Sequence, residues 1–255
     1  TSVSNLMRNF LWPLVVALVL GVLLFILGVR HMAALFVFIL CAFVILTILY
    51  EWFRGTAARH RMRQENYLKA FFGLLMANRP RYGGYIVHIG IVLIAVGVVG
   101  STSYNLEKEV TLNPNESASV GSYTLTYESR DTFQTASKQV DTATVAVYKG
   151  GKLLGRLVPE KYFHINYEQA VTEVAIRSTL AEDLYIILIG WDENNISTSF
   201  KFIVNPLVSW LWIGSIVMVA GGIIAWWPQR QRLLVTAPAE ANGVPARSRS
   251  EVRRG

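Results

Sequence analysis

Four long segments of the sequence are apolar and almost free of charged residues, and this feature limits most strongly what the chain can fold into. They cover residues 10–29, 32–50, 83–100 and 206–227. About 20 apolar residues in a helix cross the hydrocarbon core of a bilayer, so each segment predicts a transmembrane helix. The composition agrees, because 53% of the 255 residues are hydrophobic and only 16% are charged. We therefore predict a membrane α-helical protein with four transmembrane helices.

The region between the third and fourth apolar segments, residues 101–204, has a different pattern. Polar and apolar residues alternate with a period of two along residues 121–127, as in strands with one buried face. Residues 142–148 and 153–158 have the pattern of two hairpin strands, with Gly150 and Gly151 at the turn. We predict an inserted, extracytoplasmic all-β domain that forms a small antiparallel sandwich or barrel.

Basic residues are concentrated in two parts of the chain. Arginine and lysine outnumber acidic residues in 51–82 and in the tail 228–255, whereas acidic residues outnumber basic ones in 101–204. Basic segments next to transmembrane helices stay on the cytoplasmic side. We therefore expect 51–82 and the tail inside the cell and 101–204 outside. This topology accounts for the net charge of +7, so we expect the lipid bilayer, and no nucleic acid, as a partner.

Six parts of the chain follow from these patterns. They are a helical hairpin of the first two spans at 1–50, a basic cytoplasmic loop at 51–82, the third span at 83–100, the extracytoplasmic domain at 101–204, the fourth span at 205–227, and a disordered, basic cytoplasmic tail at 228–255. The loop is either a helix on the membrane surface or a helical connector. The first span is too long for a cleavable signal peptide. Since the chain begins with Thr1, we expect a processed, trimmed or partial protein.

His88 is the residue with the most specific chemical implication. It lies about five residues into the third span, or ~8 Å deep at 1.5 Å per residue. Titratable residues at this depth are costly and usually face a partner or a cavity. Glycines recur every seven residues on the opposite helix face and predict close helix packing there, whereas small and branched residues such as Gly84 and Val92 share the face of His88. This pattern fits a haem axial ligand, and it also fits a histidine that bonds to a neighbouring helix.

Other residues that could carry chemistry are sparse. Cys41 is the only cysteine, so the chain has no C-x-x-C motif for thiol–disulfide exchange or for thioether attachment of haem. His31, His60 and His164 lack metal-ligand spacing, and we expect them to be solvated. The sequence has no nucleotide-binding loop or hydrolase motif in a usable context, and its spans lack the broken helices of a transporter. We therefore assign no catalytic residue.

Three ordered motifs carry a resemblance to a known family. Residues 78–90 (NRPRYGGYIVHIG) are similar to the late histidine-bearing helix of the CcmF/NrfE/CcsA-type cytochrome c haem lyases, most of all CcmF. Residues 159–163 (PEKYF), 172–176 (TEVAI) and 183–185 (DLY) resemble the outer domain of that family. Residues 205–212 (NPLVSWLW) resemble its last span. The resemblance covers roughly residues 70–228 and identifies the chain as the C-terminal part of such a lyase.

The resemblance implies a function that composition and spacing do not give. His88 would correspond to one of two transmembrane histidines that ligate the iron of a b-type haem. The chain would take part in moving haem from its carrier CcmE onto apocytochrome c, with CcmH as a further partner, in the bacterial inner membrane with 101–204 in the periplasm. The family's tryptophan-rich motif, its outer histidine pair and its second transmembrane ligand are absent from this sequence. An N-terminal haem lyase portion must then supply them, and we expect the chain alone to be inactive.

A second hypothesis remains open on the same residues. The chain could be a non-catalytic, membrane-anchored scaffold of the cytochrome c assembly machinery, with His88 as a packing residue. Haem bound by the purified complex favours the lyase, and partner binding without haem favours the scaffold.

Overall fold

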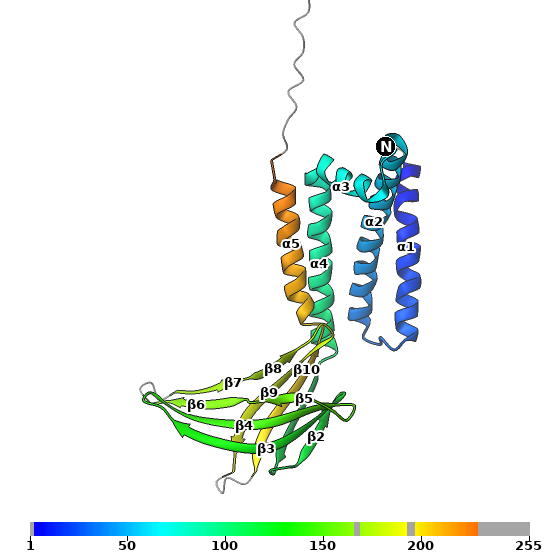
Figure 1. Ribbon diagram of the computed structural model, residues 1–255. Helices are drawn as coiled ribbons and strands as arrows, with labels where there is room; N and C mark the ends of the chain where they lie inside the picture. Colours follow the sequence, from blue (N-terminus) through cyan, green and yellow to red (C-terminus); the bar gives the residue numbers. More distant parts are fainter. Residues whose placement is uncertain (1–2, 166–168, 193–196, 229–255) are drawn as a thin grey trace, which may run out of the picture.

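The computed structural model describes residues 3–165, 169–192 and 197–228, which form a helical part and a β-sandwich (Figure 1). The helical part contains α1 (Val3–Ile26), α2 (Met32–Arg63), α3 (Tyr67–Ala77), α4 (Arg79–Ser103) and α5 (Ser209–Trp226). Within the described residues, α1, α2, α4 and α5 are long and apolar enough to cross a membrane. The predicted fold class, four such helices with an inserted β domain, is therefore confirmed.

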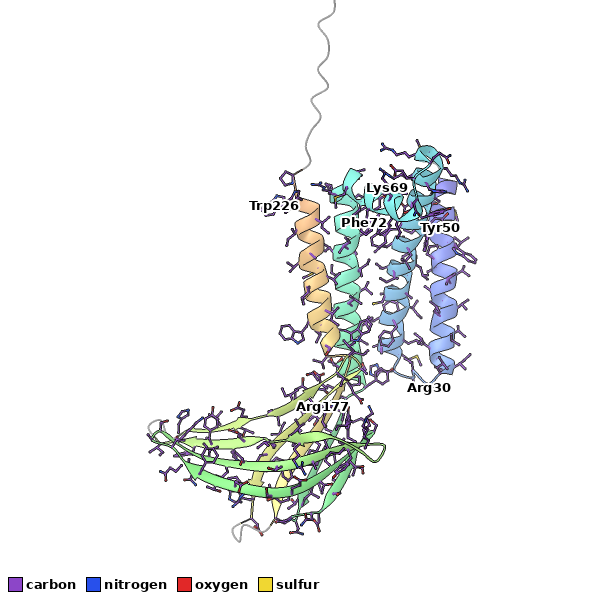
Figure 2. All side chains as sticks on the ribbon, in the orientation of Figure 1. Arg30, Tyr50, Lys69, Phe72, Arg177 and Trp226 are labelled. Carbon is purple, nitrogen blue, oxygen red and sulfur yellow. The ribbon has the colours of Figure 1, made fainter. Side chains whose placement is uncertain are left out.

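The four long helices stand side by side in the order α1, α2, α4, α5, with the sandwich below one end of the row (Figure 1). Lys69 and Trp226 lie at the end of the helices far from the sandwich, and Arg30 lies at the near end (Figure 2). The basic segment around Lys69 and the sandwich are thus separated by the length of the helices. This arrangement agrees with the sidedness expected from the charges, which stays a prediction.

The segment 51–82, for which a helical connector or a helix on the membrane surface was expected, is mostly helical. Helix α2 continues past Tyr50 to Arg63 and ends at Gln64, which has the left-handed backbone conformation typical of a helix C-terminus (φ 53°). Arg59 of α2 stabilises the turn that leads into α3. Its Nε lies 3.0 Å from Glu65 Oε2, and its Nη1 donates a hydrogen bond to the Gly73 carbonyl at 3.1 Å. The short apolar helix α3 is consequently held against α2.

The sandwich contains two antiparallel sheets. One has the strand order β1-β10-β9-β8, and the other has the order β2-β3-β4-β6-β7, with β5 paired to a further stretch of β4. The strands are β1 (Leu106–Leu112), β2 (Ser117–Val120), β3 (Tyr123–Gln134), β4 (Lys138–Lys149), β5 (Lys152–Leu157), β6 (Glu160–His164), β7 (Gln169–Glu173), β8 (Ala175–Ser178), β9 (Glu182–Trp191) and β10 (Thr198–Pro206). Of the two architectures expected, the sandwich is the one observed.

The glycine hairpin predicted from the sequence is present. Strands β4 and β5 pair antiparallel, with Lys149 opposite Lys152, so Gly150 and Gly151 form a two-residue turn. Both glycines have positive φ angles, 57° and 78°. A turn with positive φ at both central residues matches the twist of a hairpin, and glycine adopts it without a steric cost.

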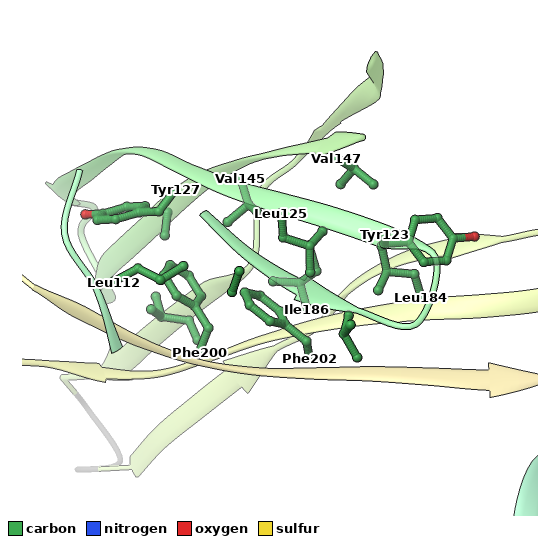
Figure 3. Close-up of a cluster of buried hydrophobic side chains, with 14 of the residues drawn as sticks. Leu112, Tyr123, Leu125, Tyr127, Val145, Val147, Leu184, Ile186, Phe200 and Phe202 are labelled. Carbon is green, nitrogen blue, oxygen red and sulfur yellow. The ribbon is translucent and has the colours of Figure 1, made fainter. Parts of the chain in front are cut away.

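The core of the sandwich lies between the two sheets (Figure 3). Alternate residues of each central strand point into it, as the burial of every second residue in β3 and β10 shows. Its largest fully buried apolar side chains are Tyr123, Tyr127 and Leu125 from one sheet and Phe200, Phe202, Leu184, Ile186 and Leu188 from the other. The buried Tyr127 hydroxyl accepts a hydrogen bond from Thr198 Oγ1 at 3.1 Å, which avoids the cost of an unpaired polar group.

Hydrogen bonds reinforce one of the two chain connections between the sandwich and the helices. Helix α4 leads into β1, and β10 leads into α5. In addition, Leu207 N, Ser209 Oγ and Trp210 Nε1 donate hydrogen bonds of 2.9, 2.8 and 2.8 Å to the carbonyl groups of residues 179–181. These three bonds tie the turn between β8 and β9 to the start of α5.

Candidate functional site: His88 on helix α4

Two residues at the start of α4 determine where the helix begins and so position His88. The side chain of Asn78 caps the helix by accepting from the Arg81 backbone N–H at 3.4 Å, and Pro80 follows in the first turn, where its missing N–H is harmless. From there the helix runs uninterrupted to Ser103 and carries His88 near the middle of its length.

The glycine face of α4 packs against α5, as predicted from the seven-residue spacing. A Cβ atom added at Gly90 would lie 2.6 Å from Met218 N and 2.7 Å from Gly214 O. A Cβ added at Gly221 would lie 2.6 Å from Val87 N. The backbones of α4 and α5 are therefore so close that the side of α4 away from His88 is closed by α5.

The imidazole of His88 has a defined tautomer. Its Nδ1 lies 2.8 Å from the carbonyl oxygen of Gly84, one turn earlier in the helix. A carbonyl oxygen can only accept, so Nδ1 carries the hydrogen. In the neutral ring, Nε2 then holds the free electron pair that binds a metal. This backbone contact is the usual arrangement behind a metal-ligating histidine, because it fixes the ring and makes the ligating nitrogen more basic.

An apolar cavity of about 220 Å³ lies beside the imidazole. Besides His88, its lining comes from three helices and contains Phe10 of α1, Phe43, Val44, Thr47 and Ile48 of α2, and Tyr85 of α4. The Thr47 hydroxyl already donates to the Phe43 carbonyl at 2.8 Å, so it adds no unpaired polar group. The volume is smaller than the roughly 300–1,000 Å³ of a complete small-ligand pocket. These residues can form one wall of a larger site.

The sequence predicted the neighbours of His88 only in part. Gly84 lies beside the ring, and a Cβ added there would meet no atom within 4 Å, so the predicted room exists at this position. Val92, however, is buried and lines a separate cavity of about 360 Å³ with Cys41 and other residues of α1 and α2. Phe10 and Phe43, which face the imidazole, had no sequence signal because helix crossing decides where they lie.

The other three histidines make local contacts. His31 caps α2 by accepting from Ala34 N at 3.4 Å, and His60 stacks on Tyr67 with ring centres 4.1 Å apart. His164 lies edge-on to Tyr162 in β6. Across the described ranges, no three His, Cys, Asp or Glu side chains come together as a metal site.

One charged cluster links the two sheets of the sandwich. Lys149 Nζ lies 2.7 Å from Glu182 Oε1 and 4.9 Å from the centre of the Tyr123 ring. Burial acts to raise the pKa of Glu182, but the hydrogen bonds from Lys149 and Tyr123 outweigh it, and the net pKa is lowered. The pKa of Lys149 is raised, chiefly by its bond to Glu182. The mutual shifts are those of a stabilising ion pair.

Known proteins share these features of sequence and structure with this chain. The model of the CcmF C-terminal β-sandwich matches residues 103–206. CcmF of Pseudomonas fluorescens is 31% identical over 220 residues, which are 86% of this chain and 32% of that protein. The chain belongs to the CcmF family. It corresponds to the C-terminal part, as the motifs around His88 and in the last span indicated.

Other relatives of the CcmF family extend the match. CcmF of Pseudomonas aeruginosa is 28% identical over 218 residues, 85% of this chain and 32% of that protein. The probable cytochrome c-type biogenesis protein NrfE of Escherichia coli is 27% identical over 172 residues, 63% of this chain and 31% of that protein. The chain therefore spans about a third of the length of these relatives.

A solved structure supports the CcmF fold. The cytochrome c haem lyase CcmF has a TM-score of 0.69 to this chain at 24% identity, covering 89% of this chain and 35% of that structure. The four apolar helices and the β-sandwich thus recur together in a protein of the family. The relatives from the two Pseudomonas species are named as cytochrome c-type biogenesis proteins, and the four apolar helices of this chain are long enough for a multi-pass membrane protein.

Proposed function

We propose that this CcmF-family chain takes part in transferring haem from a carrier to apocytochrome c, and that His88 supplies one axial ligand of a b-type haem. The observation that carries the proposal is the bond between His88 Nδ1 and the Gly84 carbonyl, which leaves Nε2 as the metal-binding nitrogen. The apolar cavity beside it is the second support.

The exposure of His88 supports a ligand that is shared with another part of the protein. The imidazole is exposed although it lies within an apolar helix that is long enough to span a bilayer. A polar ring facing hydrocarbon is costly, so a further protein surface or a bound group is expected to cover it. The 220 residues aligned with CcmF of Pseudomonas fluorescens are 32% of that protein, and the N-terminal portion of such a relative is the proposed source of that cover and of the second axial ligand.

The residues around His88 fit one side of a haem. Aromatic and aliphatic side chains, Phe10, Phe43, Ile48 and Tyr85, suit the apolar faces and edge of a macrocycle, while His88 provides the nitrogen ligand. When bound, a b-type haem supplies one-electron redox chemistry, which would keep the delivered haem iron ferrous for thioether formation. The role of this chain's residues is to bind and orient that group and to exclude water from one side of it.

The sandwich is proposed to be a periplasmic docking platform. It lies at the opposite end of the helices from the basic segment around Lys69, which the positive-inside rule assigns to the cytoplasm (Figure 2). Its proposed partners are the N-terminal haem lyase portion, the haem carrier CcmE, CcmH and apocytochrome c, in the bacterial inner membrane.

The test is an optical spectrum of the chain co-expressed with its N-terminal counterpart. The wild type should show b-type bands, His88→Ala should lose them, and the control His164→Ala, in the sandwich, should retain them. His88→Gly with added imidazole distinguishes a ligand from a packing residue, because free imidazole restores only a ligand. Unchanged bands and haem content in His88→Ala would refute the ligand assignment.

The scaffold hypothesis predicts a different outcome from the same preparation. The Gly84 bond satisfies one nitrogen of His88, as it would in a histidine that only packs. In that case the purified complex would retain assembly partners and contain no haem, and His88→Ala would leave partner binding unchanged.

A further inference from the structure

A second cavity lies at the end of the helices far from the sandwich, and it shares no lining residue with the cavity of His88. It has a volume of about 300 Å³ and is lined by Met76 of α3, Arg79 of α4, and Ile223, Ile224 and Trp227 at the end of α5. Four of these five residues are apolar, and Arg79 is the only charged one. The cavity therefore combines one cation with a hydrocarbon-like wall.

Arg79 lacks an acidic partner among the described residues. The ion pairs there involve Arg59, Arg81, Lys149, Arg156 and Lys201. Arg79 Nη1 donates only to the backbone carbonyl of Pro228, at 3.2 Å. Its Nε is buried and has no hydrogen-bond partner, which is unfavourable for a polar group. The guanidinium is thus under-satisfied and its charge is not balanced locally.

The cavity lies where lipid headgroups are expected. Helix α5 is at the outer edge of the helical row, and Trp226 projects from its end (Figures 1 and 2). Ile223, Trp226 and Trp227 are exposed, with Trp226 91% exposed. Exposed tryptophans at the end of a spanning helix mark the interface between hydrocarbon and headgroups. A ligand that reaches Arg79 from the bilayer must therefore carry both a polar head and an apolar tail.

We propose that this cavity binds an anionic phospholipid, with its phosphate at Arg79 and an acyl chain along Ile223 and Ile224. A guanidinium presents several N–H donors in the fork geometry that phosphate oxygens accept, so a small rotation of the side chain can satisfy the orphaned group. The choice of an anionic lipid follows from charge, since a zwitterionic headgroup carries its own cation beside the phosphate. The site is independent of His88 and of the proposed function.

The test measures lipid retained by the 255-residue chain in native mass spectrometry. The chain is purified in the presence of equal amounts of phosphatidylglycerol and phosphatidylcholine. The wild type should retain phosphatidylglycerol preferentially. Arg79→Gln should lower that retention about fivefold, the effect of one arginine beside an anionic bilayer surface. Arg61→Gln removes the same charge from an exposed position at the same end of the helices and should leave retention unchanged.

A second pair of variants keeps the test decisive if Arg79→Gln fails to fold. Ile223→Trp fills the cavity while retaining Arg79 and should also lower phosphatidylglycerol retention, whereas Ile216→Trp, at a position 70% exposed on the same helix, should not. Equal losses in Arg79→Gln and Arg61→Gln would show that general surface charge holds the lipid, and equal retention of both lipids by the wild type would show that the site is not selective for anions. Either result overturns the proposal.

Discussion

The contact between α4 and α5 gives a prediction that two neighbouring glycines can test against each other. A Cβ added at Gly221 would lie 2.6 Å from Val87 N and 2.9 Å from Gly83 O, whereas a Cβ added at Gly222 would meet nothing within 4 Å. Unbonded carbon atoms prefer separations of about 3.5–4.0 Å. Gly221→Ala must therefore push the two helices apart by about 1 Å, and Gly222→Ala leaves them in place.

The pair isolates the steric cost from helix propensity. Replacing glycine by alanine in a helix favours the helix by about 1 kcal/mol, and this gain applies at both positions. Inserting a methyl group into a close-packed contact costs about 1–3 kcal/mol. Gly221→Ala should therefore be less stable than Gly222→Ala by about 1–3 kcal/mol.

The assay is reversible unfolding of each variant in mixed micelles, followed by circular dichroism. Spin labels on α4 and α5 give a second measurement, because only Gly221→Ala should lengthen the distance between the helices. Equal unfolding free energies for the two variants, with equal helix separations, would show that the backbones are not in contact as described.

Three further predictions concern the sandwich. Gly151→Ala should lower the unfolding free energy by about 1–2 kcal/mol, because φ is 78° there, and an unchanged Tm would contradict the turn geometry. Glu182 has a lowered pKa, so its pair with Lys149 stabilises the fold above the ordinary pKa of about 4.5 and loses this effect as the pH falls through the lowered value. Since the pair is partly exposed, Glu182→Gln should lower the unfolding free energy by at most about 1 kcal/mol at pH 7. The variant should also lose less stability than the wild type as the pH falls below about 4.5. An equal loss in both proteins would exclude the pair as the cause of the acid dependence. Leu125→Ala should cost about 2–5 kcal/mol in urea unfolding, because the side chain is fully buried, and a loss below 1 kcal/mol would place it outside the core.

The features that the sequence predicted correctly depend on short stretches of chain. A run of about 20 apolar residues is enough to indicate a spanning helix, whatever surrounds it. The turn at Gly150 and Gly151 follows from local backbone preference and the alternation on each side. The glycine stripe that includes Gly90 follows from the helical repeat alone. Each of these needed no knowledge of which segments meet in space.

The features that escaped prediction depend on contacts between distant residues. Strand β1 pairs with β10, with Leu106 opposite Val204, and nothing near Leu106 in the sequence indicates that partner. In the same way, Phe10 of α1 reaches the cavity of His88 because of how the helices pack. Burial of Val92 against α2 also depends on that packing, so periodicity could assign it to a face of α4 but not to an environment.

The attachment of the sandwich to the helices has a mechanical consequence. The sandwich joins the helices through the connections at β1 and β10, and the bonds from the start of α5 to residues 179–181 reinforce the second of these. The three bonds stiffen the junction between β10 and α5, so a rotation or tilt of α5 should turn the sandwich with it. Because α5 is itself packed backbone to backbone on α4, the sandwich should move together with the helix that carries His88. A load placed on the sandwich by a bound partner would therefore be transmitted along α4 and α5 to the level of the histidine.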